Sequence, residues 1–76
     1  MSIEIRIPSL GAGMNEGKLV EWHAADGAAV KAGELLYTLE SEKTAQDIEA
    51  QADGVLKIIA PADETYDVGE LIGVIG

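Results

Sequence analysis

The sequence predicts an all-β fold, a small sandwich or barrel, and three observations support this prediction. Nine glycines punctuate the 76 residues. Between them lie short apolar stretches with strand character, one of which alternates strictly between polar and apolar residues. An internal repeat of about 22 residues relates the two halves of the chain. Short strands at regular spacing are typical of such folds.

The first strand is expected at the start of the chain, where Ile3, Ile5 and Ile7 alternate with polar residues and Pro8 ends the run. Further apolar stretches with strand composition follow along the chain. They cover residues 19–22, 35–39, 55–59 and 71–75.

Residues 40–52 do not fit this pattern. They are rich in Glu, Ala, Gln and Lys, which are good helix formers. Ala45, Ile48 and Ala52 also fall at helical spacing. Propensity alone therefore predicts a helix here.

The internal repeat aligns residues 17–39 with residues 54–75 when one residue is deleted after Asp26. Seven of the 22 aligned pairs are then identical, where chance would give about one or two. The pairs are Gly17 with Gly54, Leu19 with Leu56, Ala25 with Ala62, Asp26 with Asp63, and Gly33-Glu34-Leu35 with Gly69-Glu70-Leu71. Each half reads as strand, turn, short strand, turn, strand, so we expect two halves related by a pseudo-two-fold axis around a shared core.

The repeat also predicts where Lys43 lies. The first half ends at Leu39 and the chain passes Lys43, whereas the second half ends at Ile75 and the chain stops. Under pseudo-two-fold symmetry, Lys43 and the chain end lie at opposite poles. A carrier domain needs a tether at one pole and a reactive group at the other.

Length and composition narrow the functional classes. Seventy-six residues form one domain, 1–76, without Phe and with only three aromatic residues in total, so a deep substrate pocket is not expected. The net charge of −9 is the opposite of a nucleic-acid binder's. Cysteine is absent, and no apolar run reaches the roughly 18–20 residues of a membrane span. The Met1 start without a signal peptide or Arg-rich leader favours a cytoplasmic location.

The segment Glu40-Ser41-Glu42-Lys43-Thr44 resembles the lipoyl domains of 2-oxo-acid dehydrogenase acyltransferase components. Those domains carry a Glu-x-Asp-Lys-Ala type motif at the tip of a β-hairpin. Here Glu42 replaces the common Asp and Thr44 the common Ala. The resemblance covers essentially the whole chain, with further matches at residues 7–11, 16–17, 20–22, 33–35 and 53–55.

The resemblance implies a flattened sandwich of two four-stranded antiparallel sheets with internal two-fold symmetry, a single hybrid motif. It overrides the helix expected over 40–52, because 35–40 and 44–49 become the two arms of a hairpin. The turn 41–44 contains no Gly, Asn or Pro, so local turn chemistry does not explain it and a functional reason is expected.

The resemblance also implies that Lys43 carries lipoic acid in amide linkage, on a swinging-arm domain that is not catalytic alone. The implied partners are a thiamine-dependent 2-oxo-acid (or acetoin) decarboxylase, an acyltransferase core, dihydrolipoyl dehydrogenase, and a lipoate ligase or lipoyl transferase. The isolated domain is expected to be a monomer. Recognition is assigned to the hairpin and to the loop at 10–17, which is expected to lie near it. The recognition residues are Glu40, Glu42, Thr44, Gly11, Met14, Asn15 and Glu16.

Three other interpretations of Lys43 remain. It could be an ordinary solvated lysine, although its flanking acids and polar position argue against that. Biotin carriers share the fold but place their lysine between two methionines, whereas here the neighbours are Glu42 and Thr44. The third is an unmodified adaptor domain.

His23, the only histidine, has no metal or triad partner at recognisable spacing and is expected to be a polar strand residue.

Overall fold

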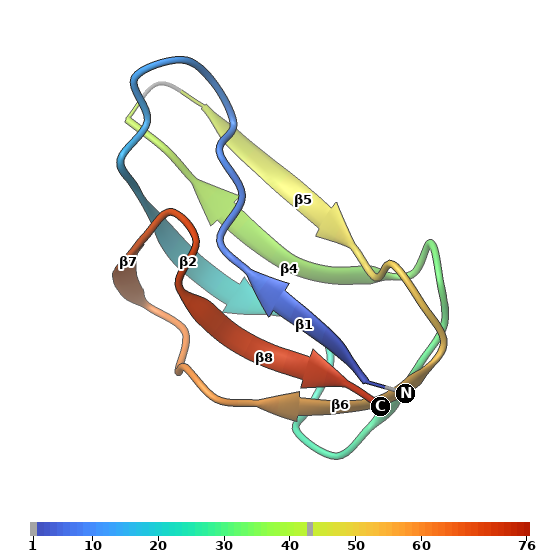
Figure 1. Cartoon of the computed structure of the whole chain (residues 1–76). Helices are drawn as coiled ribbons and strands as arrows, with labels where there is room; N and C mark the ends of the chain where they lie inside the picture. Colours follow the sequence, from blue (N-terminus) through green and yellow to red (C-terminus); the bar gives the residue numbers. More distant parts are fainter. Residues whose placement is uncertain (1, 43) are drawn as a thin grey trace.

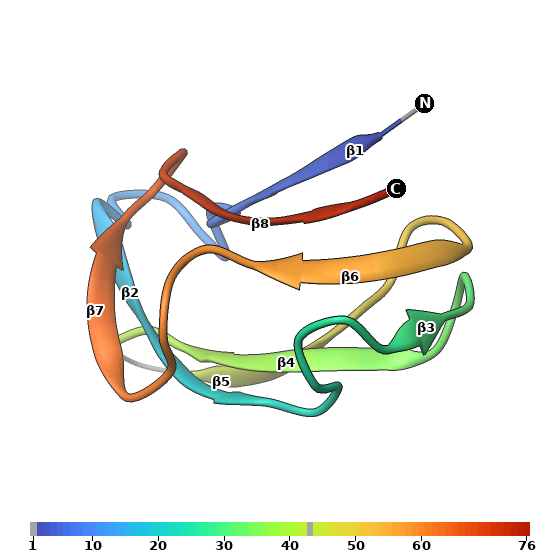
Figure 2. The same cartoon turned by 90° about the horizontal axis from the view of Figure 1, so that it is seen from below.

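The computed structural model describes residues 2–42 and 44–76, which form eight strands in two four-stranded antiparallel sheets. The strands are β1 (Ile3–Arg6), β2 (Glu16–Trp22), β3 (Ala29–Val30), β4 (Leu35–Glu40), β5 (Ala45–Glu49), β6 (Gly54–Ile58), β7 (Glu64–Asp67) and β8 (Leu71–Ile75). One sheet has the order β1-β8-β6-β3 and the other β5-β4-β2-β7 (Figure 1). The view in Figure 2 looks between the two sheets. The predicted all-β sandwich is confirmed.

The two sheets repeat one topology. Exchanging β1 with β5, β8 with β4, β6 with β2 and β3 with β7 converts the strand order of one sheet into that of the other. Turn contacts obey the same exchange: the Gly33 amide donates to the Ala50 carbonyl (2.9 Å), and the Gly69 amide donates to the Ile7 carbonyl (2.8 Å). The predicted pseudo-two-fold relation is therefore present in both the sheets and the turns.

The structure corrects one detail of the repeat alignment. The Gly27 amide donates to the Leu56 carbonyl (2.7 Å), and the Asp63 amide donates to the Leu19 carbonyl (2.6 Å). Gly27 and Asp63 also share a positive φ, 86° and 68°. The structural counterpart of Asp63 is thus Gly27 and not Asp26. The two halves have the same backbone conformation at this turn, although the residues that adopt it differ in type. The side chain of Asp26 instead accepts a hydrogen bond from the Ile58 amide (2.8 Å).

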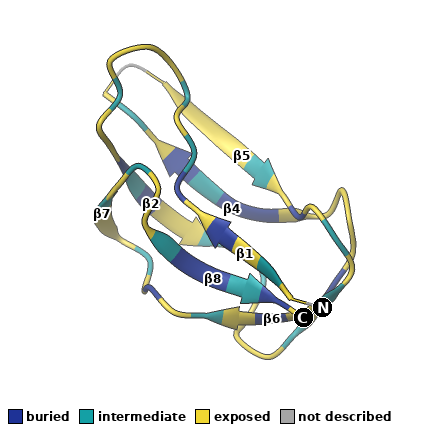
Figure 3. Cartoon of the chain, viewed as in Figure 1, coloured by how far each residue is buried: buried dark blue, intermediate teal, exposed yellow. Residues whose placement is uncertain are grey.

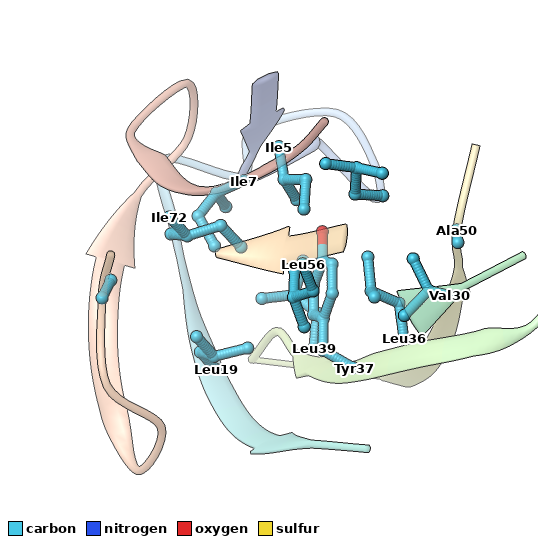
Figure 4. Packing of buried hydrophobic residues seen from close by; sticks show 12 residues of the cluster. Ile5, Ile7, Leu19, Val30, Leu36, Tyr37, Leu39, Ala50, Leu56 and Ile72 are labelled. Carbon is cyan, nitrogen blue, oxygen red and sulfur yellow. The ribbon is translucent and has the colours of Figure 1, made fainter. Parts of the chain in front are cut away.

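The core lies between the sheets and contains only apolar side chains and one tyrosine among the described residues. Leu19, Leu39, Leu56 and Ile72 have no exposed surface, and all four belong to the cluster of side chains drawn in Figure 4. In the first part of β2, burial alternates: Gly17 and Leu19 are buried, whereas Glu16 and Val20 are exposed. Buried and exposed segments of the other strands are coloured in Figure 3. Within residues 2–42 and 44–76 no charged residue is buried, and the Tyr37 phenol is the one titratable group in the core.

The helix expected from propensity over 40–52 is wrong, and the hairpin implied by the resemblance is right. Residues 45–49 form β5, which pairs with β4 through five residue pairs. Ile48 is the only residue of β5 that is not exposed. Cross-strand hydrogen bonds and the burial of Ile48 outweigh a weak helix propensity, since a helix this short is marginal on its own.

The C-terminus and the start of β1 lie at one pole of the molecule, and the end of β4 with the start of β5 lies at the other (Figure 1). Gly76 is joined to Val55 by two backbone hydrogen bonds, of 2.9 and 3.0 Å. The molecule measures 32 × 20 × 18 Å, so the poles are separated by its long axis. In the described part of the chain, no helix is long and apolar enough to cross a membrane.

Candidate functional site

The β4–β5 hairpin provides the frame of the candidate site. Its register pairs Glu40 with Ala45 and Leu39 with Gln46, so the two arms end at the same level. Lys43 lies outside the described residues. Its sequence neighbours, Glu42 and Thr44, are both exposed. The predicted hairpin is thus confirmed, while the assignment of Lys43 to its tip stays a prediction.

Ser41 closes the hairpin turn on Thr44. The Ser41 amide donates to the Thr44 carbonyl (2.7 Å), and the Thr44 amide donates to Ser41 Oγ (3.3 Å). The Ser41 hydroxyl also donates to the Thr44 carbonyl (3.1 Å). The expectation that local turn chemistry does not explain this turn is therefore wrong. Serine is a turn-forming residue because its hydroxyl can replace a backbone partner, and this signal was present in the sequence.

A series of side-chain hydrogen bonds runs from His23 through Thr38 to Asp47 and connects the two arms of the hairpin to the residue after β2. Thr38 Oγ1 donates to Asp47 Oδ1 (2.8 Å) and lies 2.6 Å from His23 Nε2. Because the Thr38 proton is directed to Asp47, His23 Nε2 must carry the hydrogen of the second bond. His23 Nδ1 lies 3.8 Å from Glu21. His23 was expected to be a polar strand residue, but it lies directly after the end of β2, from where its ring connects to β4 and β5 through Thr38 and Asp47.

The loop between β1 and β2 folds beside the hairpin, as the resemblance implied. Together they form an open groove of about 770 Å³. All seven described recognition residues line it: Gly11, Met14, Asn15 and Glu16 from the loop side, and Glu40, Glu42 and Thr44 from the hairpin. The structure brings these residues together, and their role in recognition stays a prediction.

The groove is acidic. Glu16, Glu40 and Glu42 are exposed along it, and Lys18 is the cation among its described lining residues. Lys18 Nζ lies 3.3 Å from Asp63 Oδ1, an exposed ion pair that contributes little to stability but reduces the positive field of Lys18. A groove of this charge favours a basic partner surface. No cluster of three potential metal ligands occurs in residues 2–42 and 44–76.

The chain is similar to known proteins along its whole length. Residues 3–75 match the family model described as biotin-requiring enzyme. The lipoyl domain of the 2-oxoglutarate dehydrogenase complex from Azotobacter vinelandii superimposes with a TM-score of 0.82 at 33% identity, covering 97% of this chain and 95% of that domain.

Two curated relatives are also similar to nearly the whole chain. The acetyltransferase component of the Zymomonas mobilis pyruvate dehydrogenase complex is 40% identical over 97% of this chain. The succinyltransferase component of the Rickettsia felis 2-oxoglutarate dehydrogenase complex is 38% identical over 96%. The chain spans only 17% and 18% of the lengths of these two relatives.

The chain therefore belongs to the family of biotinyl and lipoyl attachment domains. Within that family it is a lipoyl domain of the kind found in acyltransferase components of 2-oxo-acid dehydrogenase complexes, and this assignment is favoured over a biotin carrier.

Proposed function

We propose that Lys43 carries lipoic acid in amide linkage and that the chain works as the swinging-arm domain of an acyltransferase component. The observation that carries the proposal is the β4–β5 hairpin, which connects its strands at the pole opposite the chain ends. Its sequence Glu40-x-Glu42-Lys43 carries the only lysine between the two arms. A tether at one pole leaves the other free to enter a partner.

The residues around the attachment position fit such a group. Glu42 and Thr44 are exposed, and the adjoining groove is open, so the described residues leave space for an arm to extend outward. Amide formation removes the lysine charge, which makes the tip more acidic. The bound lipoyl group supplies a strained ring disulfide that takes up an acyl group and two electrons.

The proposal assigns the chain's own residues to presentation and recognition, and none to catalysis. The hairpin holds the attachment position away from the core, and the acidic groove offers a surface for docking. The proposed partners are a thiamine-dependent 2-oxo-acid decarboxylase, the acyltransferase core, dihydrolipoyl dehydrogenase and a lipoate ligase or lipoyl transferase. Their identity is supported by the complexes named for the relatives. The proposal includes a cytoplasmic location, a monomeric isolated domain and a single domain over residues 1–76.

Intact mass spectrometry tests the attachment. The chain is incubated with a lipoate ligase, lipoate and ATP, beside Lys43→Ala and the matched exposed lysine variant Lys57→Ala. We expect one lipoyl group on the wild type and on Lys57→Ala, and none on Lys43→Ala. A lipoyl group that survives Lys43→Ala would assign the site to another lysine. Modification by a biotin ligase in place of the lipoate ligase would favour the biotin carrier.

A further inference from the structure

Met14 has a different environment from its neighbours in the β1–β2 loop. Gly11, Ala12 and Gly13 are exposed, whereas Met14 is half-buried and packs against the hydrophobic core. Its Sδ accepts a hydrogen bond from the Leu10 amide (3.0 Å), and its own amide donates to the Gly11 carbonyl (3.3 Å). Hydrogen bonds of Met14 to Leu10 and Gly11 therefore hold the two ends of this loop segment together.

Gly17 provides the space that the Met14 methyl group occupies. A Cβ atom placed on Gly17 would lie 2.8 Å from Met14 Cε and 2.9 Å from Leu39 Cδ1. Real Cβ atoms do not approach other atoms this closely. Met14 and Leu39 thus converge above the bare backbone of β2, and any side chain at position 17 would displace one of them.

Leu39 connects this contact to the hairpin. It is fully buried in β4, directly before Glu40, and pairs with Gln46 of β5. Met14 therefore packs, across Gly17, beside the arm that leads to Lys43. The same Met14 lines the groove between the loop and the hairpin.

We propose that Met14 is a positioning residue that sets the distance between the β1–β2 loop and the β4–β5 hairpin, and so fits the groove to the decarboxylase that acylates the arm. This inference rests on the proposed function. Met14 acts through the loop it anchors. A thioether suits this role because it is flexible enough to fill the space over Gly17 while its sulfur accepts the Leu10 amide.

Reductive acylation kinetics test the proposal. Wild-type chain and the variants Met14→Ala, Met14→Leu and Ile58→Ala are each lipoylated to completion, as verified by mass. They are then offered to the decarboxylase components of the pyruvate and 2-oxoglutarate dehydrogenase complexes, each with its own 2-oxo acid. For Met14→Ala we expect KM to rise about tenfold while kcat stays within about twofold, because binding is lost and chemistry is not. Met14→Leu keeps the bulk and should retain a KM within about threefold of wild type.

Ile58→Ala is the matched control for stability. Ile58 packs against the core from β6 and does not line the groove, so its truncation destabilises the fold without moving the loop. An unchanged KM in Met14→Ala, or an equal KM rise in Ile58→Ala, would overturn the positioning role.

An NMR comparison decides the question independently of activity. In the wild type, we expect a nuclear Overhauser effect between the methyl group of Met14 and a methyl group of Leu39. In Met14→Ala, the amide shifts of residues 10–16 and 40–42 should change together. If these shifts stay at their wild-type values, Met14 does not position the loop. A wild-type chain that accepts no lipoyl group would contradict the proposed function instead, and the NMR result would still stand.

Discussion

Among the described residues, Tyr37 is the one ionisable side chain in the core. It is 1% exposed, and its ring lies 5.3 Å from that of Trp22 at an interplanar angle of 56°. It also lines a pocket of about 280 Å³ whose other lining residues include members of the edge strands β1 and β5. Burial disfavours the charged phenolate and raises the pKa of Tyr37 to about 12.

Stability should therefore fall at high pH. Between pH values of about 10 and 12 an unfolded Tyr37 loses its proton while the folded one keeps it, so the folded state binds more protons and the free energy of unfolding decreases as pH rises. Urea unfolding across this range measures the decrease. Tyr37→Phe should show a flatter dependence than the wild type. Equal slopes in the two proteins would mean that the phenol is not the responsible group.

Single residues account for most of what the sequence did not predict. The inward turn of Met14 depends on the missing side chain of Gly17, and this contact is visible only once β2 and the loop are placed together. The bond between His23 and Thr38 joins residues 15 positions apart, and it requires the β2–β4 register. The Ser41 turn was different, because its chemistry is local and the serine itself was a sufficient signal.

At the scale of elements, β5 is the segment where local propensity and tertiary structure disagree. Its residues Ala45, Gln46 and Glu49 favour a helix, and its partner β4 imposes an extended backbone. Because β5 is an edge strand with exposed side chains, its composition can be changed without disturbing the core.

Substitution of Gln46 tests this disagreement. Gln46→Thr introduces a β-branched residue and should raise the free energy of unfolding by up to about 1 kcal/mol. Gln46→Ala introduces the best helix former and should leave it unchanged or lower it. Chemical denaturation of both variants gives the comparison. If Gln46→Ala is more stable than Gln46→Thr, strand propensity does not determine which residue is preferred at position 46.

Most other strands followed from the sequence more directly, although β2 (Glu16–Trp22) begins three residues before the expected stretch 19–22. Period-two alternation predicted β1, and glycine spacing separated β4, β6 and β8 to within one residue of their observed ends. The short strands β3 and β7 appeared only as the middle part of each repeat, because two to four residues carry too little pattern to define a boundary. The resemblance gave one pairing, that of 35–40 with 44–49, and the residues alone left both sandwich and barrel open.

At the scale of the whole molecule, excess negative charge is the dominant electrostatic feature. Fourteen acidic residues face five basic ones. The ion pairs among the described residues are surface pairs, such as Arg6 with Glu4 at 2.9 Å, and such pairs stabilise weakly. Repulsion among the remaining carboxylates opposes the compact state.

Salt should therefore stabilise the fold. Raising NaCl from about 0.01 to about 0.5 M shortens the Debye length several-fold and should raise Tm by a few degrees. Differential scanning calorimetry at neutral pH measures the change. Glu16→Gln removes one exposed carboxylate of the acidic groove and should show a smaller response. A Tm that is independent of salt would mean that the carboxylates are too far apart to interact.

The pseudo-two-fold axis has a consequence for the chain ends. It carries the β4–β5 turn onto the gap between Ser2 and Gly76, which lie side by side at the other pole. The β4–β5 hairpin therefore has a second, equivalent antiparallel pair, formed by β8 and β1. A short peptide that joined Gly76 to Ser2 would close the second and produce a cyclic protein. A lysine in that new turn would be the symmetry counterpart of Lys43, the attachment residue proposed above.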